Sequence, residues 1–452
     1  SSVLHGGSTP SCPIDCSKLP PFSPFLHGFC VLMHLKVAIN GSGFAADYTA
    51  RVYSQLPHKN GVTIELAGVT SGRPETAARF AETHGIAQTF GSHSEMLAAV
   101  RPHIDNIACA NFAHGPYTIE AAQAGVPVIV LEKPPVIWPG WTEGRQADAR
   151  TRKEESMSYL ADVLDAVRAA GSKLLYAEDF VYVDGMKGLV ELLIESRRVD
   201  KGKVLYQRGV CAHQGSHAPA YDTPAKSGGG ALFNKACHPL GPCLYLKQVE
   251  GILRDGRPIR PRQVSAVALQ VLKHQPSAAH EHFRVMQNVD DFGRITVIFE
   301  DQTVAEVLGH DLSISGIRNE LSVIADFGQY DLRINPNNEN ELFLPRADAA
   351  GNLLLREKLP TPAGTCFPRP HQFHAHGYVN EMNDAVDCAL HAERFPQSGP
   401  LMAWDTMAVL MAGYESAENG GAMVDLSDYL EREFPANELP DPHSFGAVFQ
   451  RV

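Results

Sequence analysis

The sequence has 452 residues, of which 44% are hydrophobic and 20% are charged, and its formal net charge at pH 7 is −12. These values are ordinary for a soluble globular protein, and the length predicts two or three domains with an ample core. An acidic chain without a block rich in Lys and Arg is a poor candidate for nucleic-acid binding. No apolar run approaches the roughly 18–20 residues that a membrane span needs.

The nine cysteines are scattered, and no two of them form a C-x-x-C pair. An odd number of dispersed cysteines predicts free thiols in a reducing cytoplasm rather than a disulfide framework. Residues 1–33 are rich in Ser, Pro, Gly and Cys and show no helical or strand period. They also lack the basic start and long apolar core of a signal peptide. We predict that this segment is a disordered tail or a remnant of an expression vector.

From His34 onward, short apolar runs alternate with helical patterns. The predicted strands are 35–39, 62–70, 104–110 and 126–134, and the predicted helices follow them at 40–56, 74–84, 92–100 and 115–125. Gly85 is expected to cap one helix, and Ser92 with Glu95 has the spacing of a capping box. Regular alternation of strand and helix predicts a parallel, doubly wound sheet with right-handed crossovers.

The second half of the chain has a different pattern. Residues 136–156 are polar and are expected to leave the sheet, and a helix, a strand and a helix follow at 159–170, 173–182 and 188–196. Four later segments alternate apolar and polar residues, which predicts an antiparallel sheet with one covered face; they are 264–272, 295–301, 303–309 and 321–328. Amphipathic helices are expected at 379–395 and 406–420. We therefore predict a dinucleotide-binding domain over 34–157 and a second domain over 158–452.

A glycine-rich loop follows the first predicted strand. Gly41, Gly43 and Ala46 form G-x-G-x-x-A, in which Gly41 permits the turn, Gly43 admits a pyrophosphate and Ala46 allows close helix packing. In this strand–loop–helix setting the pattern predicts NAD or NADP binding, with contacts from the whole loop, Gly41, Ser42, Gly43, Phe44, Ala45 and Ala46. The second strand ends without the acid that holds the ribose of NAD. Ser71 and Arg73 stand there instead, and Arg suits a 2′-phosphate, which favours NADP.

Two further stretches carry candidate chemistry. The run LEKPP places Glu132 and Lys133 at the carboxyl end of a central strand, where such sheets bind their ligands. The run GGGALFNKACHPLG places Asn234 and His238 four residues apart, on one face of an expected helix that starts after three glycines. Pro239 inside that helix is expected to kink it.

Taken in order, GSGFAA, NFAH, EKP, YAEDFVY and GGGALFNKACH resemble the Gfo/Idh/MocA family of oxidoreductases, over roughly residues 35–426. The resemblance implies a Rossmann domain followed by an α/β domain with a large, mostly antiparallel open sheet that often mediates homodimers or homotetramers. It also implies reversible hydride transfer between NAD(P) and a hydroxyl-bearing carbon of a sugar, glycoside or cyclitol. The family's NFAH segment places Asn111 and His114 near the cofactor, together with Glu132 and Lys133.

The family's lysine and catalytic histidine match Lys133 and His238. The resemblance implies that Lys133 orients the reacting hydroxyl, while His238 exchanges its proton, as a group titrating near neutrality can. The glycines are then expected to let the chain approach the nicotinamide and the substrate. One departure is Asn234, where many members have Asp: an amide cannot act as a general base. We expect Asn234 to bind substrate, and proton transfer to rest on His238 and Lys133, on Lys235, or on a carboxylate from elsewhere.

Other polar residues are candidate substrate contacts because they lie near these motifs; they are Asp179, Tyr182, Arg208, His213 and His217. A second cluster, His371, His374 and His376, is interpreted as hydrogen-bonding to substrate or as solvated imidazoles, and we predict no metal site. Two alternatives to an ordinary dehydrogenase stay open. One is a sugar-modifying enzyme that runs an elimination or hydrolysis through a tightly bound, recycled NAD(P). The other is a nucleotide-binding regulator with impaired catalysis.

Overall fold

The structure, a computed structural model, describes residues 33–56, 62–215, 219–275, 283, 285–314, 316–335, 342–344, 364–366 and 376–449. Most of the predicted N-terminal tail lies outside these residues, as do His217, His371 and His374. Met33, which we assigned to the tail, is instead the first residue of strand β1 (Met33–Asn40).

The first half of the chain folds around a six-stranded sheet of order β3-β2-β1-β4-β5-β6, in which every pair is parallel. Its other strands are β2 (Val62–Thr70), β3 (Thr89–Phe90), β4 (Ile104–Ile107), β5 (Val128–Glu132) and β6 (Lys173–Ala177). The connecting helices are α1 (Phe44–Gln55), α2 (Pro74–His84), α3 (His93–Val100), α4 (His114–Gln123) and α5 (Ala149–Ala170). This strand order is that of the Rossmann fold, so the predicted class is confirmed.

The predicted helix ends follow local chemistry. Pro74 occupies the first turn of α2, and Gly85 ends it with a left-handed φ of 68°. The Ser92 hydroxyl accepts a hydrogen bond from the Glu95 amide at 3.2 Å, which caps α3 as the spacing predicted.

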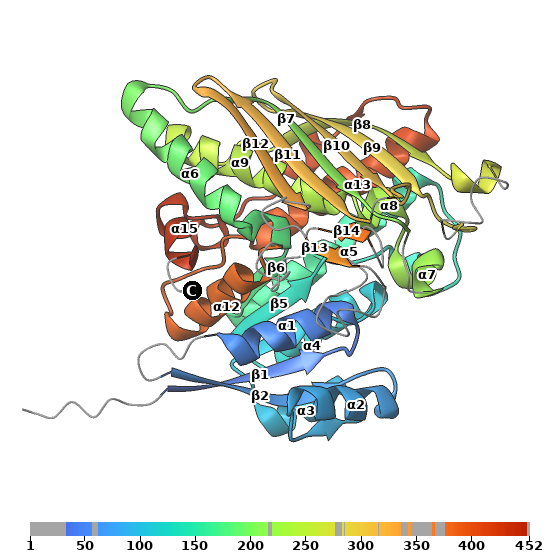
Figure 1. The fold of residues 1–452 in the computed structure, drawn as a ribbon, viewed down its shortest axis with the longest axis vertical. Coiled ribbons are helices and arrows are strands. Elements are labelled where there is room, and N and C mark those ends of the chain that lie inside the picture. The colour runs from blue at the N-terminus through green and yellow to red at the C-terminus, as the bar shows by residue number, and fades with distance from the viewer. Residues whose placement is uncertain are drawn as a thin grey trace, which may run out of the picture.

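The Rossmann domain is not one continuous stretch of sequence. The predicted boundary at residue 157 falls inside α5, and β6 beyond it is the last strand of the parallel sheet. Near the other end of the chain, α12 (Tyr378–Leu390) packs on α1 and on β4 to β6 (Figure 1). Its Met382 and Val386 share a buried core with Val37 and Ile39 of β1. The first domain is therefore completed by residues that we had assigned to the second.

The second sheet has seven strands in the order β12-β11-β7-β10-β9-β8-β15. They are β7 (Val204–Ala212), β8 (Pro261–Leu269), β9 (Phe292–Phe299), β10 (Val304–His310), β11 (Arg318–Ala325), β12 (Gly328–Asn335) and β15 (Val424–Asp425). All neighbours are antiparallel except β7 and β10, which run parallel. The mostly antiparallel sheet and its alternating burial confirm the predicted pattern.

Three helices cover one face of this sheet, α8 (Ala231–Asn234), α9 (Cys237–Asp255) and α13 (Pro400–Glu418) (Figure 1). We predicted an amphipathic α13, but it is buried on nearly every side from Pro400 to Gly413, because it lies between the large sheet and α5. The remaining elements are shorter or peripheral: α6 (Asp184–Ser196), α7 (Pro224–Ser227), β13 (Leu342–Leu344), β14 (Gly364–Cys366), α14 (Ser427–Leu430) and α15 (Pro442–Phe449).

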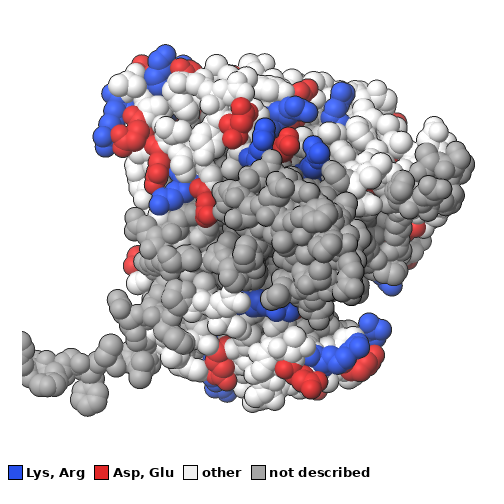
Figure 2. Space-filling view, viewed as in Figure 1, with Lys and Arg blue, Asp and Glu red and all other residues white. Residues whose placement is uncertain are grey.

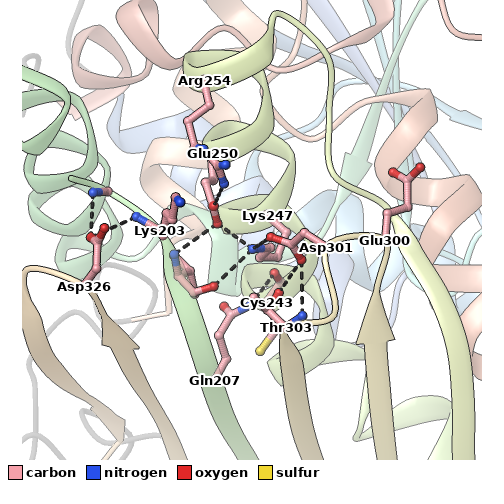
Figure 3. Close-up of polar contacts among 12 residues, drawn as sticks. Lys203, Gln207, Cys243, Lys247, Glu250, Arg254, Glu300, Asp301, Thr303 and Asp326 are labelled. Atoms are coloured by element: carbon pink, nitrogen blue, oxygen red, sulfur yellow. Dashed lines mark hydrogen bonds and ion pairs between the residues drawn. The ribbon is translucent and has the colours of Figure 1, made fainter. Parts of the chain in front are cut away.

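A fully buried lysine ties α9 to the large sheet. The Lys247 ammonium donates hydrogen bonds to the Val204 carbonyl at 3.1 Å, to Glu250 at 2.6 Å and to Asp301 at 2.8 Å (Figure 3). Glu250 also accepts from Arg254 at 2.6 Å. All three ammonium protons therefore have an acceptor, which is what a charged group needs in the interior.

On the face shown in Figure 2, the Lys and Arg side chains of the described residues are interspersed with Asp and Glu. Within the part of the chain that the structure describes, no helix combines the length and hydrophobicity needed to span a bilayer.

Candidate active site

The carboxyl edge of the parallel sheet faces α8 and the start of α9 across a cleft of about 330 Å³. Several predicted site residues line it, and they come from both domains: Phe44, Ala45, Asn111, His114, Glu132, Lys133, Asp179, His213 and His238. His376, from the second histidine cluster, lies there too. The edge brings these groups together because parallel strands all end on the same side of their sheet.

The glycine loop has the shape that a pyrophosphate needs. Gly41 has a φ of +128°, and a Cβ there would lie 2.2 Å from the Ala108 carbonyl oxygen, so no other residue fits. Gly43 caps α1, and a Cβ there would meet no atom within 4 Å, which leaves open space in front of the helix N-terminus. Ala46 is fully buried against the sheet. These residues fit a dinucleotide, whose phosphates the helix N-terminus would attract.

The two candidate residues for cofactor choice lie beside this loop. The Ser42 and Ser71 hydroxyls are 2.7 Å apart, which connects the ends of β1 and β2. Arg73 precedes α2 with a side chain that is 73% exposed, and its nearest acid, Glu75, is 3.9 Å away. Its guanidinium therefore keeps free donors at the end of β2.

Lys133 ends β5 in a loop that His114 braces. His114 Nδ1 lies 2.7 Å from the Pro134 carbonyl oxygen, and burial lowers the pKa of His114 to about 4. A neutral imidazole thus donates one hydrogen bond to the loop that directs Lys133 into the cleft. His114 is in this respect a support for the lysine as well as a cleft-lining residue.

Two carboxyl side chains contact the imidazole of His238. Its Nδ1 lies 2.9 Å from Glu178 and 3.0 Å from Asp179, and its ring stacks on Phe180 with centroids 5.0 Å apart. Burial, and then the charge of Lys133, lowers the pKa of His238 to about 4. Two carboxylates at Nδ1 select the tautomer that carries its proton there. Nε2 is then the ring nitrogen that can accept a proton.

Several acidic side chains lie near the Lys133 ammonium in the cleft. Burial raises the pKa of Glu132 to about 7 and also raises the pKa of Glu178. Burial opposes the charge of Lys133, but the electrostatic effect of its neighbours, which include the carboxyl groups of Glu132, Glu178 and Asp179, outweighs burial and raises the pKa of Lys133. Lys133 therefore remains a cation beside the neutral His238, which is the division of roles expected of an electrophile and a base.

Asn234 does not have the predicted role. The expected helix is broken: α8 ends at Asn234, two residues follow, and α9 begins at Cys237. The Asn234 amide donates to the Gly229 carbonyl at 2.7 Å, and its oxygen accepts from Asn111 at 2.9 Å. With its groups used and only 2% exposed, Asn234 joins the two domains and is not available to a substrate.

The glycine run also differs from expectation, because it packs on protein. A Cβ on Gly229 would lie 2.3 Å from the Tyr414 hydroxyl, and one on Gly230 would lie 2.0 Å from the Asp290 carbonyl oxygen. The Asp290 carboxylate accepts from the amides of Gly230 at 3.2 Å and Leu232 at 2.6 Å. Because these glycines have no side chains, residues 229–232 can approach Asp290 and Tyr414 closely. Pro239 causes no kink because it lies in the first turn of α9, where proline is tolerated.

We expect Gly230→Ala to lower the free energy of unfolding by about 3 kcal/mol, since the methyl group would collide with backbone that cannot turn away. Chemical denaturation followed by circular dichroism measures this. Gly446→Ala, in α15, is the control, because its Cβ would approach other atoms no closer than 3.8 Å. Equal stability of the two variants would contradict the packing role of Gly230.

Two other predicted substrate contacts are wrong. Tyr182 is fully buried behind the cleft, where its hydroxyl donates to Asp384 at 2.9 Å. Arg208 is exposed, because the alternation of β7 turns Gln207 and Gly209, not Arg208, toward the helices. The cleft also contains residues that we did not select, which contact it or support its histidine: Glu178, Phe180, Cys211, Tyr221, Asn319 and Tyr378. Lys235, named above as an alternative proton carrier, lines it too. Glu178 stood next to Asp179 at a strand end, a signal that could have identified it.

Glu178, Cys237 and His238 could also be considered as metal ligands, since their ligand atoms lie within 4.8 Å of one another. Burial raises the pKa of the Cys237 thiol well above its usual range, and the neighbouring Lys133 ammonium would repel a cation. The absence of a metal here stays a prediction.

Residues 35–160 match an oxidoreductase family with an NAD-binding Rossmann fold, the Gfo/Idh/MocA family. No curated protein matches the sequence significantly. Among solved structures, the chain is similar to GenD2 from gentamicin A biosynthesis in complex with NAD, with 20% identity over 90% of this chain and 99% of that one, and a TM-score of 0.68. It is also similar to myo-inositol 2-dehydrogenase from Lactobacillus plantarum (16% identity, 87% and 99% covered, TM-score 0.62). A third similar structure is scyllo-inositol dehydrogenase from Lactobacillus casei with bound NAD(H) and scyllo-inositol, with 16% identity over 87% of this chain and 99% of that one, and a TM-score of 0.60. At these identities the likeness concerns the fold.

Proposed function

Taking this chain as a member of the Gfo/Idh/MocA oxidoreductases, we propose that it transfers hydride between NAD(P) and a hydroxyl-bearing carbon of a sugar, glycoside or cyclitol. The observation that carries the proposal is the meeting of Lys133 and His238 in one cleft. Lys133 comes from the end of β5 beside the dinucleotide loop, and His238 comes from the helix that faces it. A merely structural glycine loop would not require such a pair.

A nicotinamide dinucleotide held by the loop at Gly41 and Gly43 would supply the hydride acceptor for oxidation. The Lys133 ammonium donates a hydrogen bond to the reacting hydroxyl oxygen and stabilises the negative charge that develops there. Nε2 of His238 takes the hydroxyl proton, and the carboxylates of Glu178 and Asp179 at Nδ1 stabilise the imidazolium that results. In reduction the same groups act in reverse, with His238 donating the proton.

The polyhydroxylated substrate is supported by the polar cleft and by the fold relatives. Imidazole, hydroxyl, amide and ammonium groups line the cleft; they belong to His213, Tyr221, Lys235, Asn319 and His376. Donors and acceptors in this mixture suit several hydroxyl groups. Two similar folds belong to inositol dehydrogenases, whose substrates are of this kind.

The test is mass spectrometry of any nucleotide released when the purified protein is denatured, together with titration of NAD⁺ and NADP⁺. Reversible binding of one nucleotide, and its reduction by a compound from a panel of sugars and cyclitols, is the expected result. Stoichiometric retained nucleotide with turnover that needs no added cofactor would instead identify the recycled-cofactor mechanism. Binding without any redox change in the presence of the panel would identify a regulator, and a failure to bind either nucleotide would overturn the proposal.

We also propose that Arg73 favours NADP over NAD. Its exposed guanidinium stands at the end of β2, where it can contact a 2′-phosphate, with the Ser71 hydroxyl beside it. Arg73→Ala is expected to raise the dissociation constant for NADP⁺ about tenfold and to leave that for NAD⁺ nearly unchanged. Tryptophan fluorescence titration of both nucleotides measures the two constants. Arg79→Ala, on the exposed surface of α2, is the control, and a parallel loss for both nucleotides would contradict the assignment.

The proposal also covers the oligomeric state and the cellular compartment. The large sheet supports a homodimer or homotetramer, since alternate residues of β9 to β11 are only partly buried by the described residues on the face away from the helices. Cys109, Cys237, Cys243 and Cys388 are free thiols, which supports a reducing compartment such as the cytoplasm.

A further inference from the structure

The cleft contains a second lysine whose ammonium has no hydrogen-bond acceptor in the described part of the chain. Lys235 lies in the break between α8 and α9, lines the cleft and is only 7% exposed. Its nearest carboxylate oxygen, on Asp311, is 3.9 Å away, which is too far for a hydrogen bond. Its other close partner is the Tyr221 ring, whose centroid is 4.8 Å from the ammonium.

Other buried lysines of this chain show how such a group is normally satisfied. Lys247 has three oxygen acceptors within 3.1 Å (Figure 3). Lys173, which is more exposed, still donates to two carbonyl oxygens at 2.7 Å. A buried ammonium that lacks hydrogen-bond acceptors costs free energy. Unlike Lys247 and Lys173, Lys235 does not make these hydrogen bonds within the described residues. A ligand that enters the cleft can supply the missing hydrogen-bond acceptors.

We infer that Lys235 binds a carboxylate of the substrate, so that the substrate is a polyhydroxy acid such as a uronic acid rather than a neutral sugar. The inference rests on the proposed function and names its substrate class. Lys133 then engages the reacting hydroxyl, while Lys235, which lines the same cleft, engages the acid group.

Charge decides between the kinds of acceptor. The Asp311 carboxylate, 3.9 Å away, balances part of the Lys235 charge but is too far to accept a hydrogen bond from it. A carboxylate that enters the cleft forms a charge-assisted hydrogen bond with Lys235, which is stronger than the hydrogen bond of a neutral hydroxyl. Phosphate sites favour the bidentate donors of arginine, and no arginine is among the described residues that line the cleft.

The experiment compares matched pairs of ligands on the nucleotide-saturated protein. The pairs are D-glucose with D-glucuronate and D-galactose with D-galacturonate, and D-glucose 6-phosphate tests the phosphate. Isothermal titration calorimetry measures binding, and absorbance at the nicotinamide band measures turnover. We expect at least one acid to bind about tenfold or more tightly than its neutral partner, as a charge-assisted hydrogen bond allows.

Variants assign this preference to the lysine. Lys235→Gln is expected to abolish the preference for the acid, and Lys235→Arg, which keeps the charge, is expected to retain it. Lys226→Gln removes an exposed positive charge from α7 outside the cleft and should change nothing. Retention of the preference in Lys235→Gln, equal binding within both pairs, or tighter binding of the phosphate than of both acids would overturn the inference. Turnover of neutral sugars in those cases leaves the proposed function intact. Conversely, an acid that binds through Lys235 but is never oxidised counts against the proposed function alone.

Discussion

Replacing His238 by Asn is expected to lower kcat for alcohol oxidation by about 10²–10⁴-fold, because it removes the base that accepts the hydroxyl proton. Nucleotide affinity should stay within about twofold, since the dinucleotide loop lies on the other domain. Steady-state kinetics with the best substrate of the panel, together with nucleotide titration, measures both quantities. A similar loss of nucleotide affinity would instead indicate that the substitution disturbs the whole cleft.

The pH profile gives this prediction a second readout. Because the pKa of His238 is lowered to about 4, the imidazole is neutral and able to accept a proton at neutral pH. Oxidation by the wild-type protein should therefore hold steady from neutrality down to about pH 5 and fall as His238 becomes protonated near pH 4. The residual activity of His238→Asn should lack this acidic limb. An unchanged limb in the variant would assign the titration to another group, such as Asp179 or Glu178.

Replacing Lys247 by Met is expected to lower the free energy of unfolding by about 3–5 kcal/mol. The substitution leaves Glu250, which is fully buried, and Asp301 without the cation that now bridges them to the start of β7. Chemical denaturation at pH 7 measures the change. Lys187→Met is the matched control, because its partner Glu191 is 3.8 Å away on the surface of α6 and such pairs contribute at most about 1 kcal/mol.

Acid gives a further check on Lys247. Burial alone would raise the pKa of Asp301, but hydrogen bonds from Lys247 and Thr303 outweigh it and hold this pKa below its usual value. A carboxyl group with a lowered folded pKa stabilises the protein above its unfolded pKa, and the contribution disappears as the pH falls through the folded value. The stability gap between the wild-type protein and Lys247→Met should therefore narrow below about pH 4. A gap that stayed constant down to pH 2 would place the effect in packing rather than in charge.

Much of the fold follows from local rules, and those parts were predictable. The apolar runs around Val37, Val69 and Val130 are strands because their side chains are buried on both faces of a parallel sheet. Gly85 and Ser92 act within a few residues of their own positions, so their sequence context was sufficient. Gly41 was also predictable, because its φ of +128° belongs to the turn at the end of β1, although the atom that a Cβ there would meet, the Ala108 carbonyl oxygen, is distant in sequence.

The failures involve partners that are distant in sequence. The break after Asn234 depends on the hydrogen bond from the Leu232 amide to Asp290, which lies 56 residues after Asn234, and on the hydrogen bond from Asn111, which lies 123 residues before it. No local sequence pattern contains these partners. Tyr182 resembled a site residue until its contact with Asp384 was known. The lone lysine after Asn234 gave no local sign that its charge would be buried. Sequence therefore indicated the chemistry of Lys133 and His238, while the packing around them decided which neighbours take part.

The return of α12 to the first domain also has a consequence for how this protein is made. A ribosome releases the chain from the N-terminus, so β1 to β6 emerge well before Met382 and Val386 can cover their core. Until then the exposed apolar face of the nascent Rossmann sheet remains open to chaperones or to aggregation, as is general for incomplete domains. The nucleotide-binding half of the molecule, although it is synthesised first, can reach its mature core only when nearly the entire chain has been translated.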